Sequence, residues 1–209
     1  MKPPLRYQMT EFDCGTVSLL NAISFLFDRE EIPAELIRAI NIYTLDCYDE
    51  AGQLGGCGTS KEAINMLAHW MENYSKTKDF QIKCERYDGH EVTLDLIKSK
   101  LKKGTVIFAK SWLTEGHYVI ITKIDDKYAY IFDPYYLSEK RFDESSDGKV
   151  GFYRDSKRFA LDPAIEIILD HPFDYNRRVT LARLGADANK DFSLRKLDER
   201  EILVIRRTK

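Results

Sequence analysis

Cysteine is scarce in this chain, with four among 209 residues. So few thiols in a chain of this length do not form the disulfide framework that holds small secreted domains together. Proline and glycine are also few, at six and eleven residues, which excludes collagen-like and low-complexity proteins. The composition therefore predicts a globular domain, long enough to bury a sizeable core, with four thiols to explain.

The chain has neither a large excess of positive or negative charge nor a long apolar run. The 32 basic residues nearly balance the 34 acidic ones, so we expect no global field that recruits nucleic acid. No stretch reaches the roughly 18 apolar residues of a membrane span. No apolar segment of a secretory signal precedes Glu11 and Asp13. We therefore expect a cytoplasmic protein with reduced thiols and no membrane span, and the oligomeric state stays open.

Helical patterns come first along the chain and strand patterns follow. Apolar spacing and start signals predict helices over 14–27, from Pro33, from Thr59 or Ser60, and over 93–102. Strand patterns cover 80–84, 106–110, 117–124, 128–132, 165–169, 178–181 and 202–205. This order favours an α+β fold over a doubly wound sheet. Residues 138–158 are charged and rich in Asp, Ser and Gly, which predicts an exposed excursion without a clear domain boundary.

The most informative segment surrounds Cys14, which opens an apolar helix. Free N–H groups and the dipole at a helix start favour an anion, so a thiolate there is a ready nucleophile if a base lies nearby. Gln8 lies six residues upstream, and its amide and the Cys14 N–H can together supply two donors to an oxyanion. Asp13 is better interpreted as the N-cap of this helix than as a catalytic acid.

The base is sought among four histidines. Three of them occupy a helix edge or polar turns: His69, His90 and His171. His117 differs because it follows Gly116 and begins an apolar strand, which holds a side chain more firmly than a loop does. We therefore predict that His117 is the base.

A third group comes from the hairpin that follows His117. If Asp125 and Asp126 form its turn, paired residue numbers sum to about 250–252, which places Asp133 opposite His117 or one step diagonal. A carboxylate there can accept the imidazole N–H and stabilise the imidazolium. Pro134 ends the strand directly after it.

These residues, in this order, resemble the C39 cysteine peptidases. The resemblance rests on Gln8-x4-Asp13-Cys14-Gly15, Gly58-Thr59-Ser60, Gly116-His117-Tyr118-Val119 and Asp133-Pro134, and it covers about residues 5–137. It implies a papain-like cysteine protease fold, with N-terminal helices packed on an antiparallel β-sheet. It also implies a catalytic triad of Cys14, His117 and Asp133, with Gln8 in the oxyanion hole. The expected organisation is a C39-like domain over 1–137 and a C-terminal elaboration over 138–209 in the same domain.

The chain departs from the best-known members of that family. Those members are parts of ABC transporters, whereas no transmembrane segment and no Walker-type loop occurs here. We expect a free-standing cysteine peptidase that acts on peptide or isopeptide bonds of a peptide or protein substrate. Two alternatives stay open: an acyltransferase that uses the same triad, and a peptide-binding module that has lost catalysis.

Plainer interpretations stand beside these. Cys14 can be a small buried core residue, and Gln8 can simply bond local backbone. Cys47, Cys57 and Cys84 lack the paired C-x2-C spacing of a zinc site, so we expect no metal and no cofactor. Cys57 lies in a glycine-rich loop, where it is either an ordinary loop residue or a substrate contact.

Overall fold

The computed structural model describes residues 1–78, 80–136, 162–168 and 170–208. Its helices are α1 (Cys14–Leu26), α2 (Ala34–Tyr43), α3 (Lys61–Thr77), α4 (Leu94–Lys100) and α6 (Leu181–Leu184). Its strands are β1 (Ile82–Asp88), β2 (Thr105–Leu113), β3 (Glu115–Ile124), β4 (Tyr128–Phe132), β5 (Ile165–Ile167), β6 (Arg177–Thr180) and β7 (Glu201–Arg207). The α+β prediction is confirmed. The excursion predicted over 138–158 lies outside the described residues.

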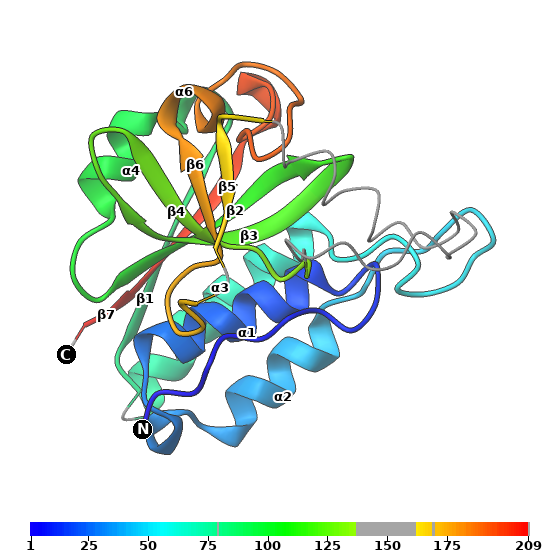
Figure 1. Cartoon of the computed structure of the whole chain (residues 1–209). Helices are drawn as coiled ribbons and strands as arrows, with labels where there is room; N and C mark the ends of the chain where they lie inside the picture. Colours follow the sequence, from blue (N-terminus) through cyan, green and yellow to red (C-terminus); the bar gives the residue numbers. More distant parts are fainter. Residues whose placement is uncertain (79, 137–161, 169, 209) are drawn as a thin grey trace.

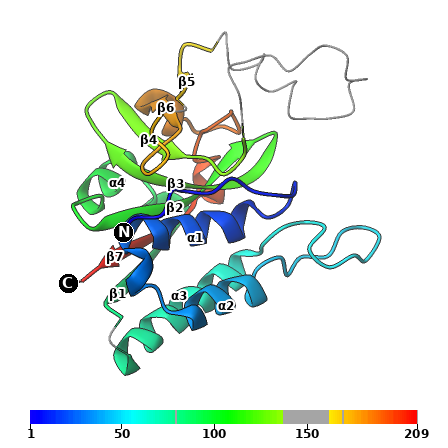
Figure 2. The ribbon, with the colours of Figure 1, turned by 60° about the horizontal axis from the view of Figure 1, so that its bottom comes forward.

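One antiparallel sheet organises the molecule, in the order β1-β7-β2-β3-β4-β6-β5. Helices α1, α2 and α3 lie along one face of it, and α4 and α6 lie on the other side (Figures 1 and 2). The expected packing of N-terminal helices on an antiparallel sheet is therefore confirmed. Strands β5, β6 and β7 come from the last third of the chain, so the C-terminal residues extend the same sheet as β2–β4.

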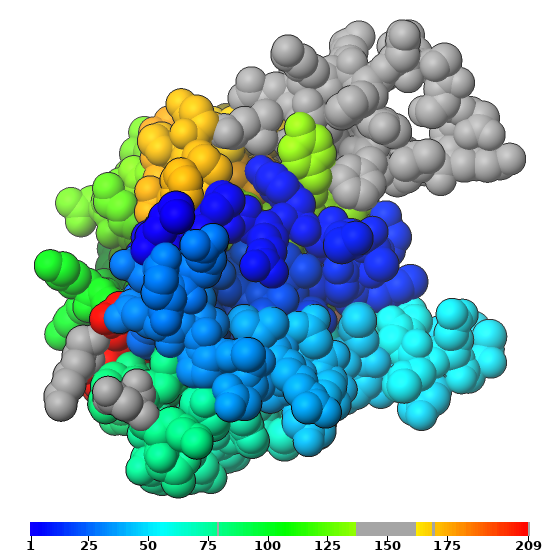
Figure 3. Space-filling view, turned by 90° about the horizontal axis from the view of Figure 1, so that it is seen from below, coloured from blue at the N-terminus to red at the C-terminus, as the bar shows by residue number. Residues whose placement is uncertain are grey.

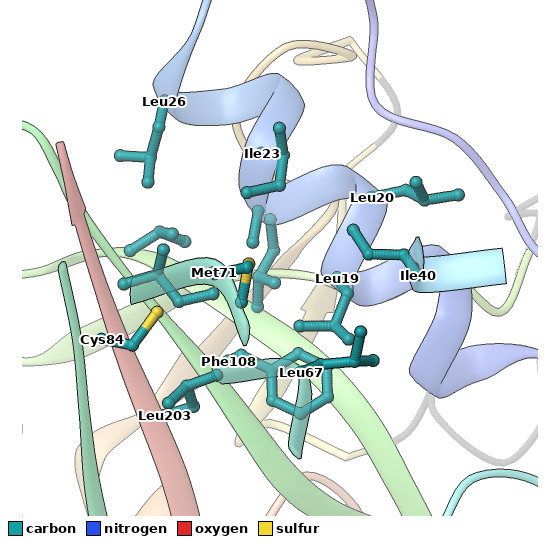
Figure 4. Packing of buried hydrophobic residues seen from close by; sticks show 14 of the residues in the cluster. Leu19, Leu20, Ile23, Leu26, Ile40, Leu67, Met71, Cys84, Phe108 and Leu203 are labelled. Carbon is teal, nitrogen blue, oxygen red and sulfur yellow. The ribbon is translucent and has the colours of Figure 1, made fainter. Parts of the chain in front are cut away.

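Two apolar cores lie on the two faces of the sheet. Alternation along β3 sends Tyr118 and Ile120 into the core beneath α1, and Val119 and Ile121 into the other core. Leu19 and Ile23 of α1 are fully buried in the first core, with Leu67 and Met71 of α3 beside them (Figure 4). Burial of this stripe fixes the axis of α1 and hence the position of its first residue, Cys14.

Local signals explain most element starts. Ser60 caps α3 by accepting a hydrogen bond from Ala63 N–H at 3.0 Å, and Pro33 precedes the first residue of α2. Several sequence-based boundaries were wrong by a few residues. β1 spans Ile82–Asp88 and not 80–84, β2 extends to Leu113, α4 ends at Lys100, and Leu181 begins α6 instead of ending β6. No helix in the described part of the chain is long and apolar enough to cross a membrane.

Candidate active site

The N-terminal segment is fastened beside α1, which brings residues 5–13 close to the sheet. Asn21 of α1 accepts a hydrogen bond from Arg6 N–H at 2.7 Å and donates one to the Arg6 carbonyl at 2.8 Å. Gln8 N–H then donates to the Pro134 carbonyl at 2.9 Å. The segment before Cys14 therefore lies against the residues that follow Asp133.

The start of α1 is locked onto β3 next to His117. The buried hydroxyl of Ser18 donates to the Tyr118 carbonyl at 2.9 Å. Gly15 permits the contact, because a Cβ there would lie 2.9 Å from two atoms of Thr59 and 3.2 Å from the Tyr118 ring. Thr59, in turn, accepts a hydrogen bond from Leu45 N–H at 3.1 Å. Glycine at position 15 thus lets Cys14 approach the strand that carries His117.

Asp13 precedes Cys14 and occupies the N-cap position, but its side chain makes no capping hydrogen bond. The carboxylate accepts instead from Met9 N–H at 3.0 Å, Thr10 N–H at 2.9 Å and the Thr10 hydroxyl at 2.8 Å. The prediction that Asp13 caps the helix is therefore wrong for its side chain, because the preceding loop turns back onto it. The uncapped N–H groups of the first turn stay free of the Asp13 carboxylate and next to Cys14.

His117 and Asp133 are joined as the hairpin register predicts. Ile120 pairs with Phe132 and Ile121 with Ile131, so the residue numbers sum to 252 at the open end of the hairpin. Extending that register places Asp133 one step diagonal to His117. The His117 Nε2 atom lies 2.7 Å from Asp133 Oδ1, with both side chains buried.

The Cys14 side chain lies near the same imidazole and affects its pKa. Burial alone would lower the pKa of His117, but the charge of Asp133 and then that of Cys14 outweigh burial and raise this pKa from 6.5 to about 10. The interaction of the Cys14 side chain with the ring adds to the same effect. Nε2 faces Asp133, which leaves Nδ1 as the ring nitrogen available to Cys14. The direction of this shift favours the protonated imidazole at neutral pH.

Asp133 is itself held by residues that sequence reasoning missed. Asn176 accepts a hydrogen bond from Asp133 N–H at 2.8 Å and donates one to its carbonyl at 2.7 Å. Asp133 Oδ1 also accepts from Tyr135 N–H at 2.8 Å. The fully buried Arg177 places its Nη2 atom 3.6 Å from Asp133 Oδ2, and burial lowers the pKa of this guanidinium. A buried cation and an amide clamp thus support the carboxylate behind His117.

Gln8 lies in the same region but is engaged elsewhere. Its Nε2 atom donates to the Thr10 carbonyl at 2.7 Å, and its Oε1 atom is buried without a hydrogen-bond partner among the described residues. An amide nitrogen carries two hydrogens, so one remains to donate. The structure joins His117 to Asp133 directly and places Cys14 near enough to raise the pKa of His117. The hydrogen bonds of the described residues link the Cys14 side chain to neither His117 nor Gln8.

A cavity of about 310 Å³ opens beside Cys14. It lies where the segment before α1, the residues between α2 and α3, and the β2–β3 hairpin meet, at the end of the molecule from which the residues between α2 and α3 project (Figures 1 and 3). Its wall is partly ionic: Lys110 Nζ lies 3.2 Å from Glu201 Oε1, and Arg195 Nη2 lies 3.0 Å from Glu199. The exposed Cys57 also lines this cavity, as Gly56 and Gly58 do.

The other three histidines and Cys84 stand apart from this arrangement, whereas Cys47 N–H donates to the carbonyl of Gly58 in the cavity wall at 3.2 Å. His69 and His90 are exposed, and His171 lies 3.7 Å from Asp170 near the surface. Cys84 is buried in the core beneath α1. Within the described ranges, no three His, Cys, Asp or Glu side chains are grouped so that they could hold a metal ion.

No protein-family model, no curated protein and no solved structure matches the chain.

Proposed function

We propose that this chain is a cysteine peptidase-like thiol hydrolase with a papain-like fold, acting on peptide or isopeptide bonds. The observation that carries the proposal is the position of the buried His117 ring. Asp133 Oδ1 lies 2.7 Å from one ring nitrogen, and Cys14 lies near enough to the same ring to raise its pKa. A nucleophile, a base and a group that orients the base are the parts that acyl transfer requires. The resemblance of the motifs to C39 peptidases supports the same function.

In this mechanism the Cys14 thiolate attacks the carbonyl carbon of the substrate and forms an S–C bond. The carbonyl oxygen takes the negative charge and accepts a hydrogen bond from the Cys14 N–H, with the second amide hydrogen of Gln8 as the proposed partner donor. The C–N bond then breaks as His117 gives its proton to the leaving amine. A thioester on Cys14 remains.

Water completes the cycle. Neutral His117 takes a proton from water, and the resulting hydroxide attacks the thioester carbonyl. The S–C bond breaks, the carboxylic acid leaves, and the thiolate–imidazolium pair is restored. Asp133 keeps the imidazole oriented through both steps and stabilises its charged form.

A peptidyl acyloxymethyl ketone tests the proposal, because it alkylates an activated thiolate in a peptide-binding site. We expect one adduct on Cys14, identified by mass spectrometry of proteolytic fragments. His117→Ala should slow this labelling by about 100-fold, the scale on which a positioned acid or base contributes. Unchanged labelling in folded His117→Ala would contradict the triad.

Cys57→Ser is the matched control, since Cys57 lines the same cavity and is more exposed than Cys14. This substitution should leave the rate and the site of labelling unchanged. If folded protein gains no adduct on Cys14, the site is a peptide-binding cleft and not a hydrolase. If the Cys14 thioester passes to an added amine and not to water, the chain is an acyltransferase.

A further inference from the structure

A strongly basic surface lies at the opposite end of the sheet from Cys14. Two neighbouring concavities of about 510 and 340 Å³ share Lys102, Lys103 and Thr105 in their walls. We call this surface the basic groove and define it by its six cationic side chains: Lys83, Lys100, Lys102, Lys103, Lys123 and Arg206.

The groove is distant from the candidate active site. Thr105 is the first of the nine residues of β2, whereas the hairpin at the far end of β2 adjoins the Cys14 cavity. At about 3.3 Å per residue, the two ends of the strand lie roughly 25 Å apart. Figure 1 shows α4 and the chain end after β7 at the side away from the start of α1. The groove therefore belongs to a different surface.

Most of the positive charge in the groove is not neutralised. Glu85 is the only carboxylate among the described residues that line the two concavities. It lies 2.5 Å from Lys100 Nζ and 3.2 Å from Lys83 Nζ, and the hydrogen bond from Lys100 is the main reason that the pKa of Glu85 falls to about 2. Lys102, Lys103 and Arg206 form no ion pair with any described residue.

Lys123 likewise forms no ion pair with any described residue, although its charge contributes to lowering the pKa of Asp125. Its ammonium lies 4.9 Å from the centre of the Tyr130 ring. Four cations are thus concentrated on one surface of a chain whose formal net charge is −2. Such a local positive field attracts anionic partners, although the molecule as a whole has no net positive charge.

The chemistry of the groove favours separate carboxylates over phosphate. Compact phosphate sites use helix N-termini, backbone N–H nests or arginine forks, whereas here α4 presents its carbonyl end, at Lys100. Single-stranded nucleic acid is held by exposed aromatic rings on which bases stack. The only aromatic side chain in either wall is the partly buried Phe25, which packs against the core beneath α1.

We propose that the basic groove binds an extended acidic peptide segment of a protein partner, rich in Asp and Glu. Ammonium groups distributed over two concavities match carboxylates spaced along an extended chain, which advances about 3.3 Å per residue. Binding at this surface does not depend on the chemistry of Cys14.

Fluorescence anisotropy with a labelled peptide of alternating Glu and Gly tests this proposal. The triple variant Lys102→Ala/Lys103→Ala/Arg206→Ala should bind it about tenfold more weakly than the unaltered chain, as expected for three exposed ion pairs. Added salt should weaken binding to the unaltered chain and narrow the difference.

The matched control removes three exposed cations from helices α2 and α3 and the residue after α3, with Arg38→Ala/Lys76→Ala/Lys78→Ala. It should change the affinity by less than about twofold. An equal loss in both triple variants would assign binding to net charge and overturn the proposal. Tighter binding of a single-stranded oligonucleotide of the same charge would overturn it as well. Each outcome is independent of Cys14 labelling, so it leaves the proposed hydrolase untouched.

Discussion

The Asn176 carboxamide forms two hydrogen bonds with the backbone of Asp133: its oxygen accepts from the Asp133 N–H at 2.8 Å, and its nitrogen donates to the Asp133 carbonyl at 2.7 Å. Both residues are buried, so neither bond competes freely with water. Asp133 directly follows Phe132, the last residue of β4. The clamp fixes the carboxylate that orients His117, which makes Asn176 a positioning residue for the proposed site.

Asn176→Ala should lower the free energy of unfolding by about 2 kcal/mol, because two buried hydrogen bonds are lost. It should also lower the rate of Cys14 labelling by the peptidyl probe and shift the pH profile of that labelling, since Asp133 would no longer be fixed beside His117. Urea denaturation and labelling measured over a pH series check both effects. Asn41→Ala is the control, because its single hydrogen bond to Ile37 is exposed; it should change stability by less than about 0.5 kcal/mol and leave labelling unchanged. A labelling profile that stays unchanged in a destabilised Asn176→Ala would limit Asn176 to a structural role.

The protonation of His117 gives a second prediction. With a pKa of about 10, the imidazole should remain charged at pH 8, and nitrogen chemical shifts of the ring can follow its titration. Cys14→Ser removes one of the two charges that raise this pKa, so the midpoint should move to lower pH. A midpoint near the ordinary 6.5 in the unaltered chain would contradict stabilisation of the buried imidazolium by Asp133 and Cys14.

The raised pKa of His117 also makes stability depend on pH. In the unaltered chain this pKa rises from 6.5 to about 10, so the stabilisation is complete below the unfolded pKa of 6.5 and is lost as pH rises through the folded pKa. The unaltered chain should therefore lose more unfolding free energy above pH 6.5 than His117→Gln does. Parallel urea titrations across this range measure the difference, and two curves of equal slope would exclude it.

The sequence predicted the parts of the site that depend on local spacing. Counting from the predicted turn paired His117 with Asp133 to within one diagonal step. Beside the turn, Ile124 pairs with Ala129 at a sum of 253, outside the predicted range, and an irregularity between Ile121 and Lys123 brings the sum to 252 at the open end. The helix start at Cys14 could be predicted because apolar helical spacing is also a local pattern.

Asn176 and Arg177 could not be predicted, because they reach Asp133 from the start of β6 and the residue before it, 43 residues later in the case of Asn176. No local pattern records that contact. A polar Asn-Arg pair at a strand start has the composition of a solvated turn, and only the sheet order places it in the interior.

The orientation of polar side chains was the other feature that sequence could not supply. Asp13 has the residue type and position of an N-cap, yet three donors from Met9 and Thr10 take its carboxylate. Gln8 likewise donates to Thr10. These side chains can form hydrogen bonds either with the loop backbone or with groups at the helix start, at similar free energy. Residue spacing does not reveal which set forms.

The close approach of α1 to β3 can be tested at Gly15. In Gly15→Ala the added Cβ would lie 2.9 Å from Thr59 and 3.2 Å from Tyr118, so α1 or Thr59 must shift and the Tyr118 ring must give way slightly. We expect a loss of about 1–3 kcal/mol in unfolding free energy, together with slower Cys14 labelling. Gly52→Ala controls for glycine replacement, because no atom lies within 4 Å of its added Cβ; strain from its φ of +77° is then the main cost, and labelling should be unchanged. Labelling at the full rate in Gly15→Ala would show that the position of Cys14 does not depend on this close approach.

The two cysteines outside the proposed mechanism that differ most in exposure should react in opposite ways. Burial, and to a lesser extent the charge of Glu72, raise the pKa of Cys84 well above its usual range, so its thiol is both inaccessible and protonated. Iodoacetamide reacts with the thiolate, and it should therefore modify the exposed Cys57 in the native protein while leaving Cys84 unmodified until urea unfolds the chain. Mass spectrometry of native and unfolded samples gives the order of modification, with Cys57→Ser identifying the first site. Because Cys84 packs in the core beneath α1, native modification at Cys84 would mean that this core opens without global unfolding, and the position of Cys14 would then not be fixed by packing.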